Sequence, residues 1–325
     1  MRAVRFHRHG PPADVLQLDD VPTPEPGPGH VRLRLTHRPV HPADLSMVKG
    51  TYGRSRALPA VGGNEGFGVV DAVGEGVSLA VGQRAIKLGE APTWQEAVVL
   101  PEAEAFPVPD ALADEAAAQL FVNPLTARLL CRVADLGSGD VLVQTAGASA
   151  VARIAAEMAL ARGARAVAIV RSGDQRDRLE ALGATVVVAD ANTAETRAAL
   201  SEAVGAGGAA AVFDPVAGDV GALALSVVRE GGAHVVYGAL SGAPLPVSPA
   251  ALIYRDVHVS GVWRTRWAGR VNADVLRDAL SELAADAVAG VFTLPVDATF
   301  DLADVAQAVR RSTAHGRWGK VLLTG

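Results

Sequence analysis

Largely apolar runs of strand length alternate with alanine-rich, helix-forming stretches from residue 141 onward. The five clearest runs are Val141–Gln144, Ala166–Val170, Thr185–Ala189, Ala210–Phe213 and Ala233–Tyr237. Apolar strands separated by helices are typical of a parallel sheet covered on both faces. The pattern therefore predicts an α/β domain, a Rossmann doubly wound parallel sheet that binds its ligand beyond the carboxyl ends of the strands.

The first hundred residues carry shorter β-type runs with glycine and proline between them. These runs are Ala3–Phe6, Val31–Leu35, Gly66–Val73, Arg84–Leu88 and Gln95–Leu100. Their spacing predicts a small, strongly bent β-barrel. Because the prolines of Val21–Gly29 remove backbone donors, we expect that segment to be a surface connection.

The composition changes at Asp114, where an alanine- and leucine-rich helical stretch begins that Asn123-Pro124 must break or kink. Beyond the Rossmann pattern, the chain adds a β run at His258–Trp263, two helical segments and a closing strand at Lys320–Thr324. We therefore predict a barrel domain from residues 1–116 and 259–325, and a Rossmann domain from residues 117–258.

The segment Val141–Arg171 has the order strand, small-residue turn, helix, strand that opens a dinucleotide-binding domain. Backbone N–H groups at the start of a helix, free of bulky side chains, can contact a pyrophosphate. The usual fingerprint has three glycines, whereas this turn has Gly147 followed by Ala148, Ala150 and Ala152. A simple packing turn between strand and helix is the alternative interpretation.

Arg171 stands at the end of the second Rossmann strand, where NAD-dependent proteins usually have a carboxylate for the ribose 2′-hydroxyl. An arginine favours a 2′-phosphate instead, so we expect NADPH as the cofactor, with Ser172 extending the same loop. The alternative is an arginine that merely follows a strand into solvent.

The formal charge of −5 over 325 residues argues against general binding of nucleic acid, which needs a basic surface. No apolar run is long enough to suggest a membrane span, and the N-terminus lacks the apolar core of a signal peptide. We therefore expect a cytoplasmic protein. The single cysteine, Cys131, excludes an internal disulfide and cysteine-rich zinc motifs, and we expect it to be buried.

Several motifs resemble one family. Gly68, Gly74 and Gly82 resemble the barrel signature of the medium-chain dehydrogenase/reductase superfamily. Further stretches are similar to its zinc-independent 2-enoyl thioester reductases, the mitochondrial trans-2-enoyl-CoA reductase type and its bacterial relatives: His41–Gly53, Leu58–Gly66, Phe121–Ala127 and Val235–Trp267. The resemblance covers essentially the whole chain and implies a GroES-like β-barrel catalytic domain beside the Rossmann domain.

The resemblance also bears on metal. Zinc-dependent members have a histidine where this chain has Asn64, and a lobe of four cysteines that this chain lacks. We therefore expect no metal. A site built from His41, Asp44 and Glu65 is the alternative, because these are residue types that bind zinc.

The family's catalytic tyrosine corresponds to Tyr52. A phenol is protonated at pH 7, so it can donate a hydrogen bond to a developing oxyanion or deliver a proton. The alternative is an ordinary loop aromatic. The resemblance further implies a set of cofactor-binding residues: Asn123, Ala148, Ser149, Ala150, Val151, Tyr237, Gly238, Ala239, Leu240, Val262, Trp263, Arg264 and Lys320.

We therefore expect NADPH-dependent reduction of an α,β-unsaturated thioester carried by CoA or acyl carrier protein, in a homodimer paired through His258–Trp263. Arg54 and Arg56 are among the candidates for contacting the phosphates of CoA. A zinc-free quinone or enone reductase is the enzymatic alternative, with small conjugated carbonyls as substrates. A non-catalytic protein that senses NADPH is the third interpretation, because a fold does not by itself specify a function.

Overall fold

The computed structural model describes residues 1–325 and divides into two compact units. Unit 1 contains residues 1–122, 273–289 and 294–325, and unit 2 contains residues 123–272 and 290–293. A boundary after residue 258, as expected from the sequence, would fall inside strand β14 (His258–Gly261), which pairs with a strand of unit 2. This strand is an exposed edge of the sheet, so it lacks the apolar run of the buried strands.

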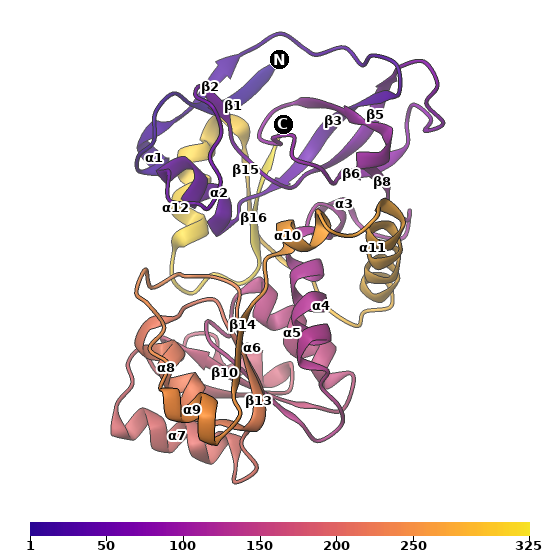
Figure 1. The fold of residues 1–325 in the computed structure, drawn as a ribbon. Coiled ribbons are helices and arrows are strands. Elements are labelled where there is room, and N and C mark those ends of the chain that lie inside the picture. Colours follow the sequence, from indigo (N-terminus) through magenta and orange to yellow (C-terminus); the bar gives the residue numbers. More distant parts are fainter. The chain divides into compact units, whose positions relative to one another are not determined.

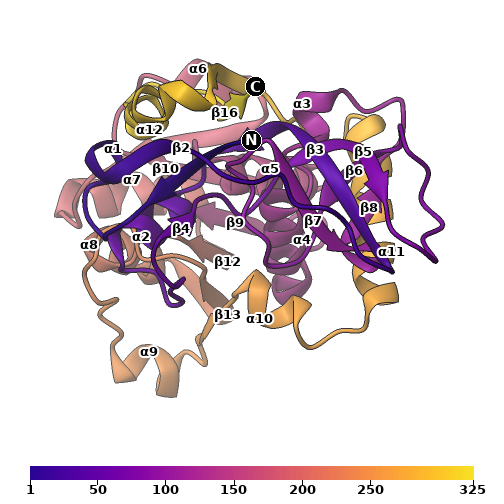
Figure 2. The same cartoon turned by 90° about the horizontal axis from the view of Figure 1, so that it is seen from above.

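Unit 1 is built mainly from antiparallel strands in two sheets (Figures 1 and 2). The three-stranded sheet has the order β2-β1-β4, and the larger sheet has the order β15-β16-β3-β5-β6-β8, with β7 also paired to β3. The strands are β1 (Arg2–Phe6), β2 (Leu16–Asp20), β3 (His30–Pro39), β4 (Ala60–Val61), β5 (Phe67–Val73), β6 (Arg84–Lys87), β7 (Ala97–Pro101), β8 (Ala105–Pro107), β15 (Val296–Asp301) and β16 (Lys320–Thr324).

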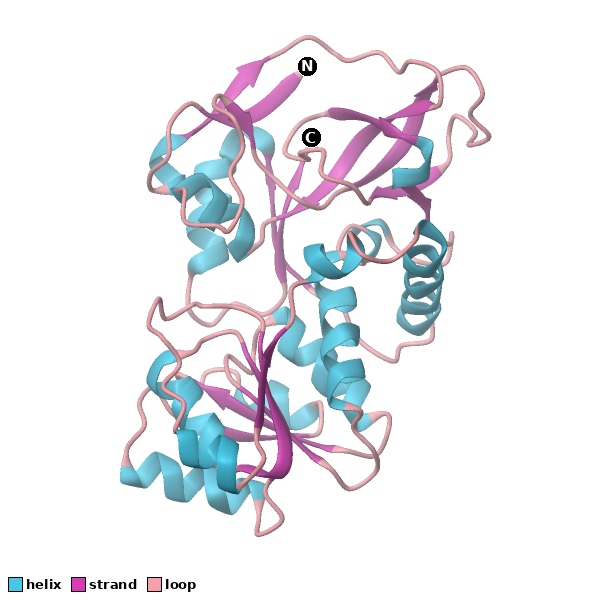
Figure 3. Cartoon of the chain, in the orientation of Figure 1, coloured by secondary structure: helices cyan, strands magenta, loops and turns pink.

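The helices of unit 1 lie beside its sheets in two groups, α1, α2 and α12 at one side and α3 and α11 at the other (Figures 1 and 3). They are α1 (Pro12–Val15), α2 (Pro42–Lys49), α3 (Asp114–Ala117), α11 (Ala273–Val288) and α12 (Val305–Thr313), with short 3-10 turns at η1 (Glu102–Glu104) and η2 (Leu302–Asp304). Strands and helices from both ends of the chain share one core, in which Phe6, Val48, Trp94, Val309 and Leu323 are all buried.

Arg38 lies fully buried in unit 1 and donates only to backbone carbonyls. Its guanidinium contacts the oxygens of Leu35 at 2.6 Å, Gln95 at 2.9 Å, Leu323 at 3.5 Å and Gly325 at 2.9 Å. Burial lowers the pKa of Arg38 to about 10. The side chain thus holds β3, the approach to β7 and the end of β16 together.

Unit 2 is the predicted Rossmann sheet. Its six strands have the order β11-β10-β9-β12-β13-β14, and every neighbouring pair is parallel. The strand order reverses between β9 and β12, and ligands of open α/β sheets bind at such a switch point. The other strands of this sheet are β9 (Val141–Gln144), β10 (Arg165–Val170), β11 (Ala184–Val188), β12 (Ala209–Asp214) and β13 (Val228–Val236).

The helices of unit 2 are α4 (Val122–Ala134), which begins at the unit boundary, α5 (Ala150–Leu160), α6 (Arg176–Ala181), α7 (Ala194–Val204), α8 (Gly218–Ser226), α9 (Pro249–Tyr254) and α10 (Arg264–Ala268). The helical stretch is interrupted, but the break lies at residues 118–121, between α3 and α4, and the predicted position at Asn123-Pro124 is wrong because both residues lie in the first turn of α4. Pro124 is the third residue of α4, where a missing N–H costs no helical hydrogen bond. No helix is both long and apolar enough to cross a membrane.

Candidate functional site

The small-residue turn of unit 2 joins β9 to α5. A Cβ atom on Gly147 would lie 2.5 Å from the Cβ of Ala168, so only glycine lets the turn lie this close to β10. Ser149 caps α5 and its Oγ accepts from the N–H of Ala152 at 3.4 Å. The N–H groups of Ala150 and Val151 open the helix, where no intrahelical acceptor exists. The turn, with Ala148 inside it, therefore fits a pyrophosphate.

A buried carboxylate lies at the switch point next to this turn. Asp214 Oδ1 accepts from Thr145 Oγ1 at 2.5 Å and from the N–H groups of Val216 and Ala217 at 2.8 and 3.0 Å. Its Oδ2 lies 3.1 Å from Nε2 of His234. Burial alone would raise the pKa of Asp214, but the hydrogen bonds from His234, Thr145 and the backbone outweigh it, and the pKa is lowered.

This carboxylate also holds a strained backbone. Ala217 has φ 61° and ψ −155°, a conformation that residues with a Cβ rarely adopt. Such strain persists only where surrounding contacts enforce it, and strained residues cluster at ligand sites. Asp214 therefore shapes the loop after β12, where the sheet predicts a ligand.

The loop after β13 runs beside the same turn. The hydroxyl of Tyr237 is shielded from water and lies near Ser149, but it makes no hydrogen bond of good geometry. Burial raises the pKa of Tyr237, and the nearby Ser149 offsets only part of that rise. Gly238 lies against Pro215, where a Cβ would come within 2.8 Å of the carbonyl oxygen, and Ala239 and Leu240 are exposed. Tyr237 therefore lies near Ser149 of the predicted phosphate turn, whereas Gly238 and Leu240 contact Pro215 in the loop after β12.

Arg171 and Ser172 lie exposed at the end of β10. Arg171 makes no ion pair, which leaves its guanidinium available for an anion. Sequence reasoning missed a hydrogen bond in this loop, in which the hydroxyl of Ser172 donates to the carboxylate of Asp174 at 2.9 Å. A carboxylate therefore stands in the same loop as Arg171.

Three predicted cofactor residues follow β14, and a fourth begins unit 2. Val262 extends the pairing of β14, since its N–H donates to the carbonyl of Val236 at 2.9 Å. Trp263 is 39% exposed, and Arg264 begins α10. Asn123 is only 5% exposed, and its Nδ2 has no hydrogen-bond partner. An unpartnered buried donor fits a ligand that supplies an acceptor.

Tyr52 lies in unit 1, just beyond the end of α2. Gly50 closes the helix with φ 77°, and the N–H groups of Thr51 and Tyr52 both donate to the carbonyl of Ser46, at 2.9 and 3.2 Å. A Cβ on Gly50 would come within 2.9 Å of the ring of His9, which packs there. These contacts hold a half-buried tyrosine in a defined turn.

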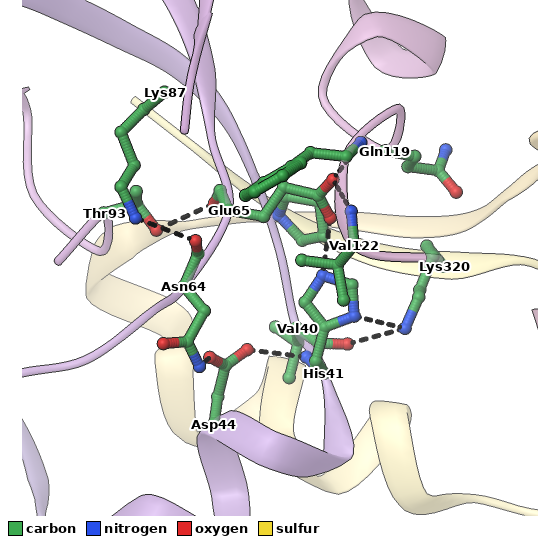
Figure 4. A network of polar contacts seen from close by, with 12 residues as sticks. Val40, His41, Asp44, Asn64, Glu65, Lys87, Thr93, Gln119, Val122 and Lys320 are labelled. Carbon is green, nitrogen blue, oxygen red and sulfur yellow. Dashed lines mark hydrogen bonds and ion pairs between the residues drawn. The ribbon is translucent and has the colours of Figure 1, made fainter. Parts of the chain in front are cut away.

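A network of buried polar side chains lies at the other end of α2, where that helix begins (Figure 4). His41 Nε2 lies 2.7 Å from Glu65 Oε2, and His41 Nδ1 lies 2.9 Å from Lys320 Nζ. The second oxygen of Glu65 accepts from the N–H groups of Phe121 and Val122 at 2.6 and 2.7 Å. Lys320, expected on the cofactor, therefore contacts His41 within unit 1.

Asp44 and Asn64 continue the network (Figure 4). Asp44 accepts from the N–H of His41 at 2.7 Å and from Asn64 Nδ2 at 2.5 Å, and burial raises its pKa despite the hydrogen bond from the His41 backbone. Arg56 donates to Asn64 and to the carbonyls of Val61 and Gly63. Its donors are engaged inside the protein, which disfavours Arg56 as a contact for CoA phosphates.

These contacts also bear on the alternative metal site of His41, Asp44 and Glu65. No three His, Cys, Asp or Glu side chains are grouped so as to hold a metal ion. Lys320 Nζ contacts Nδ1 of His41, and both carboxylate oxygens of Glu65 are already hydrogen-bonded within the protein. The donor set present therefore forms a network of protein hydrogen bonds. Cys131 is buried, and burial raises its pKa to about 11.

Comparisons with known proteins match both units. Residues 27–110 match the family model of the alcohol dehydrogenase GroES-like domain, and residues 150–285 match that of zinc-binding dehydrogenase. A mitochondrial enoyl-[acyl-carrier-protein] reductase from Bos taurus is 31% identical over 333 residues, which cover 100% of this chain and 88% of the relative. The chain belongs to the medium-chain dehydrogenase/reductase superfamily.

Solved structures of this superfamily agree. A candidate NADPH:quinone reductase from Bacillus thuringiensis superposes with a TM-score of 0.89 at 31% identity, covering 100% of this chain and 98% of that one. A mycobacterial protein complexed with NADPH superposes with a TM-score of 0.89 at 27% identity, with full coverage of both chains. The predicted fold class is confirmed, and this medium-chain dehydrogenase/reductase is an oxidoreductase that uses a nicotinamide cofactor.

Sequence reasoning missed the bond between Lys320 and His41 in this medium-chain dehydrogenase/reductase, and it gave no account of why His41 is a histidine. The residues are far apart in the chain, and β16 reaches His41 only because it pairs with β3. One available signal was that Lys320 begins an otherwise apolar strand. A charge at the start of a buried strand needs a partner.

Proposed function

We propose that the protein catalyses NADPH-dependent reduction of the C=C bond of 2-enoyl thioesters. The observation that carries this proposal is the full-length similarity to enoyl-[acyl-carrier-protein] reductase, with Tyr52 in the loop that matches the family's catalytic tyrosine. The NADPH-oxidation assay described below can also compare CoA with acyl carrier protein as the carrier, and acyl chains of different length.

NADPH fits the residues of unit 2. The turn at Ala148–Val151 would hold the pyrophosphate, Arg171 the 2′-phosphate, and Asn123 an acceptor group of the cofactor. Tyr237 offers a second unpartnered polar group beside the turn. When bound, NADPH supplies the hydride that reduces the β-carbon of the substrate.

Tyr52 acts on the other half of the reaction. As the β-carbon is reduced, negative charge develops on the thioester oxygen, and the α-carbon then takes up a proton. The phenol of Tyr52 donates a hydrogen bond to that oxygen or delivers the proton, both of which lower the barrier. The turn that fixes Thr51 and Tyr52 on the carbonyl of Ser46 limits the loop's freedom before substrate arrives.

The test is NADPH oxidation with crotonyl-CoA, compared with 1,4-benzoquinone, for the wild type and Tyr52→Phe. We expect the substitution to lower kcat with crotonyl-CoA by about 100-fold or more, since about 100-fold is the lower end of the range for a positioned acid. Tyr254→Phe is the matched control, because Tyr254 is 78% exposed. Crotonyl-CoA turnover unchanged in Tyr52→Phe would contradict the role of Tyr52.

A quinone or enone reductase is the second candidate, because the Bacillus thuringiensis structure is named for quinone reduction. It predicts turnover of 1,4-benzoquinone that does not depend on Tyr52. Activity on the quinone alone, unaffected by Tyr52→Phe, would replace the first proposal with this one.

We also propose a homodimer that pairs through β14. This strand is the edge of the Rossmann sheet, and the neighbouring α9 exposes Leu252, Ile253 and Tyr254. Light scattering of the purified protein tests this, and a monomeric mass would contradict it. A cytoplasmic location stays a prediction, to be checked by fractionation, and mitochondrial names belong to several relatives.

A further inference from the structure

His41 connects two oppositely charged side chains that do not touch. The ammonium of Lys320 has only donors, so the nitrogen it faces, Nδ1 of His41, must accept. The proton of a neutral imidazole then lies on Nε2, which donates to Glu65 at 2.7 Å. Lys320 and Glu65 together therefore fix both the tautomer and the orientation of the His41 ring.

Glu65 carries this arrangement to the backbone. Its Oε1 accepts from the N–H groups of Phe121 and Val122, at the start of α4. A carboxylate at this position satisfies helix donors that have no intrahelical acceptor and is favoured by the helix dipole. The chain then passes directly to Asn123.

Asn123 follows directly after these two residues and has an unpartnered side-chain amide. Its side chain is 5% exposed, and its Nδ2 has no partner in the protein. An orphaned buried donor is unusual in a folded protein and indicates an absent acceptor. The two N–H groups held by Glu65 belong to the two residues immediately before Asn123.

We propose that His41 is a positioning residue for Asn123. It couples Lys320 to Glu65, and Glu65 fixes the peptide groups that orient Asn123 toward an acceptor on the nicotinamide cofactor. The cofactor contact of Asn123 rests on the proposed function, whereas the connection from Lys320 to the start of α4 does not.

Glu65→Gln gives a sharp test of the connection. The amide keeps one oxygen for the N–H groups of Phe121 and Val122, so its NH2 group must face His41. His41 then has to accept on Nε2 and carry its proton on Nδ1, where it meets the ammonium of Lys320. Removing that ammonium in Glu65→Gln/Lys320→Met relieves the conflict, so the double variant is expected to be less perturbed than the single one.

The first measurement is amide hydrogen exchange of the full-length protein without ligand, read in peptides that cover residues 118–124. We expect faster exchange there in His41→Asn and Glu65→Gln, and partial recovery in the double variant, with the strands of unit 2 unchanged. His30→Asn is the matched control, because the side chain of His30 forms a hydrogen bond only with the nearby carbonyl of Pro28.

The second measurement is the KM for NADPH and kcat for the same variants. We expect His41→Asn to raise KM on the order of tenfold, the scale of a misplaced contact, with a smaller change in kcat. Wild-type exchange in both single variants, or a double variant no better protected than Glu65→Gln, would overturn the connection.

Faster exchange together with an unchanged KM would overturn the role in positioning Asn123. A wild-type protein that does not bind NADPH would refute the proposed function and, with it, the cofactor contact of Asn123. The exchange result would then still decide whether His41 connects Lys320 to α4.

Discussion

Asp214→Asn removes one charge from the switch point while keeping the shape of the side chain. The amide oxygen can take the place of Oδ1, which accepts from Thr145, Val216 and Ala217. The NH2 group then faces Nε2 of His234, which must give up its proton to Nδ1. That nitrogen is buried and has no partner, so the new N–H is left without an acceptor.

The magnitude follows from these four contacts. A hydrogen bond to a charged acceptor contributes roughly 1 kcal/mol more than a neutral one, so three weakened bonds cost about 3 kcal/mol. The unsatisfied N–H of His234 costs about 1 kcal/mol more. Burying an amide instead of a carboxylate returns about 1 to 2 kcal/mol. We therefore expect a net loss of about 2–3 kcal/mol.

The assay is urea unfolding of unit 2, followed by a probe placed in that unit, because two units need not unfold together. Asp219→Asn is the matched control, since Asp219 is exposed in the first turn of α8. We expect the control to change stability by less than about 0.5 kcal/mol. A loss below about 1 kcal/mol for Asp214→Asn would refute the reasoning from charged hydrogen bonds.

The same variant has a predicted pH dependence. The pKa of Asp214 is lower in the folded protein than its ordinary value, so its ionised form stabilises the fold above the unfolded pKa. That contribution is lost as the pH falls through the folded pKa. The stability gap between the wild type and Asp214→Asn should therefore be full at pH 6 and narrow below about pH 4. A gap that widens in acid would contradict the direction of the shift.

Three further substitutions test other parts of the structure. Arg171→Ala should raise the KM for NADPH by about 10- to 100-fold and leave the KM for NADH unchanged, with Arg197→Ala as the control. Equal effects on both cofactors would show that Arg171 does not contact the 2′-phosphate. Arg38→Met should destabilise unit 1 by about 3 kcal/mol in urea unfolding, because buried carbonyls lose their donor, and a loss below about 1 kcal/mol would argue against this. Tyr237→Phe removes a hydroxyl that makes no hydrogen bond of good geometry, so the protein should unfold at the same or a higher temperature while the KM for NADPH rises severalfold. A marked loss of stability would show that the hydroxyl is bonded to Ser149.

Much of the fold was predictable because buried parallel strands have a distinctive sequence. The runs at Val141–Gln144 and Ala166–Val170 lie within a residue of β9 and β10, and the closing strand at Lys320–Thr324 matches β16. Strands with exposed faces were harder. β2 (Leu16–Asp20) was missed, because most of its residues face solvent and no apolar run marks it.

The candidate site divides in the same way. Local chemistry was readable from the sequence, since the turn at Gly147–Ser149 and the start of α5 depend on neighbouring residues alone. The bonds of Lys320 to His41, and of Asp214 to His234, join residues distant in the chain. Spacing carries no information about such contacts, because they depend on which strands become neighbours in a sheet.

The discontinuity of unit 1 has a consequence for how the chain folds during synthesis. Unit 2 is nearly continuous in sequence, whereas β16 enters the larger sheet of unit 1 between β15 and β3, after more than two hundred intervening residues have been made. Closing so long a loop is slow, and until it closes Arg38 and Pro39 at the end of β3 lack their strand partners in β16. The emerging chain is therefore expected to complete unit 2 first and to finish the larger sheet of unit 1 only when β15 and β16, its last strands, arrive.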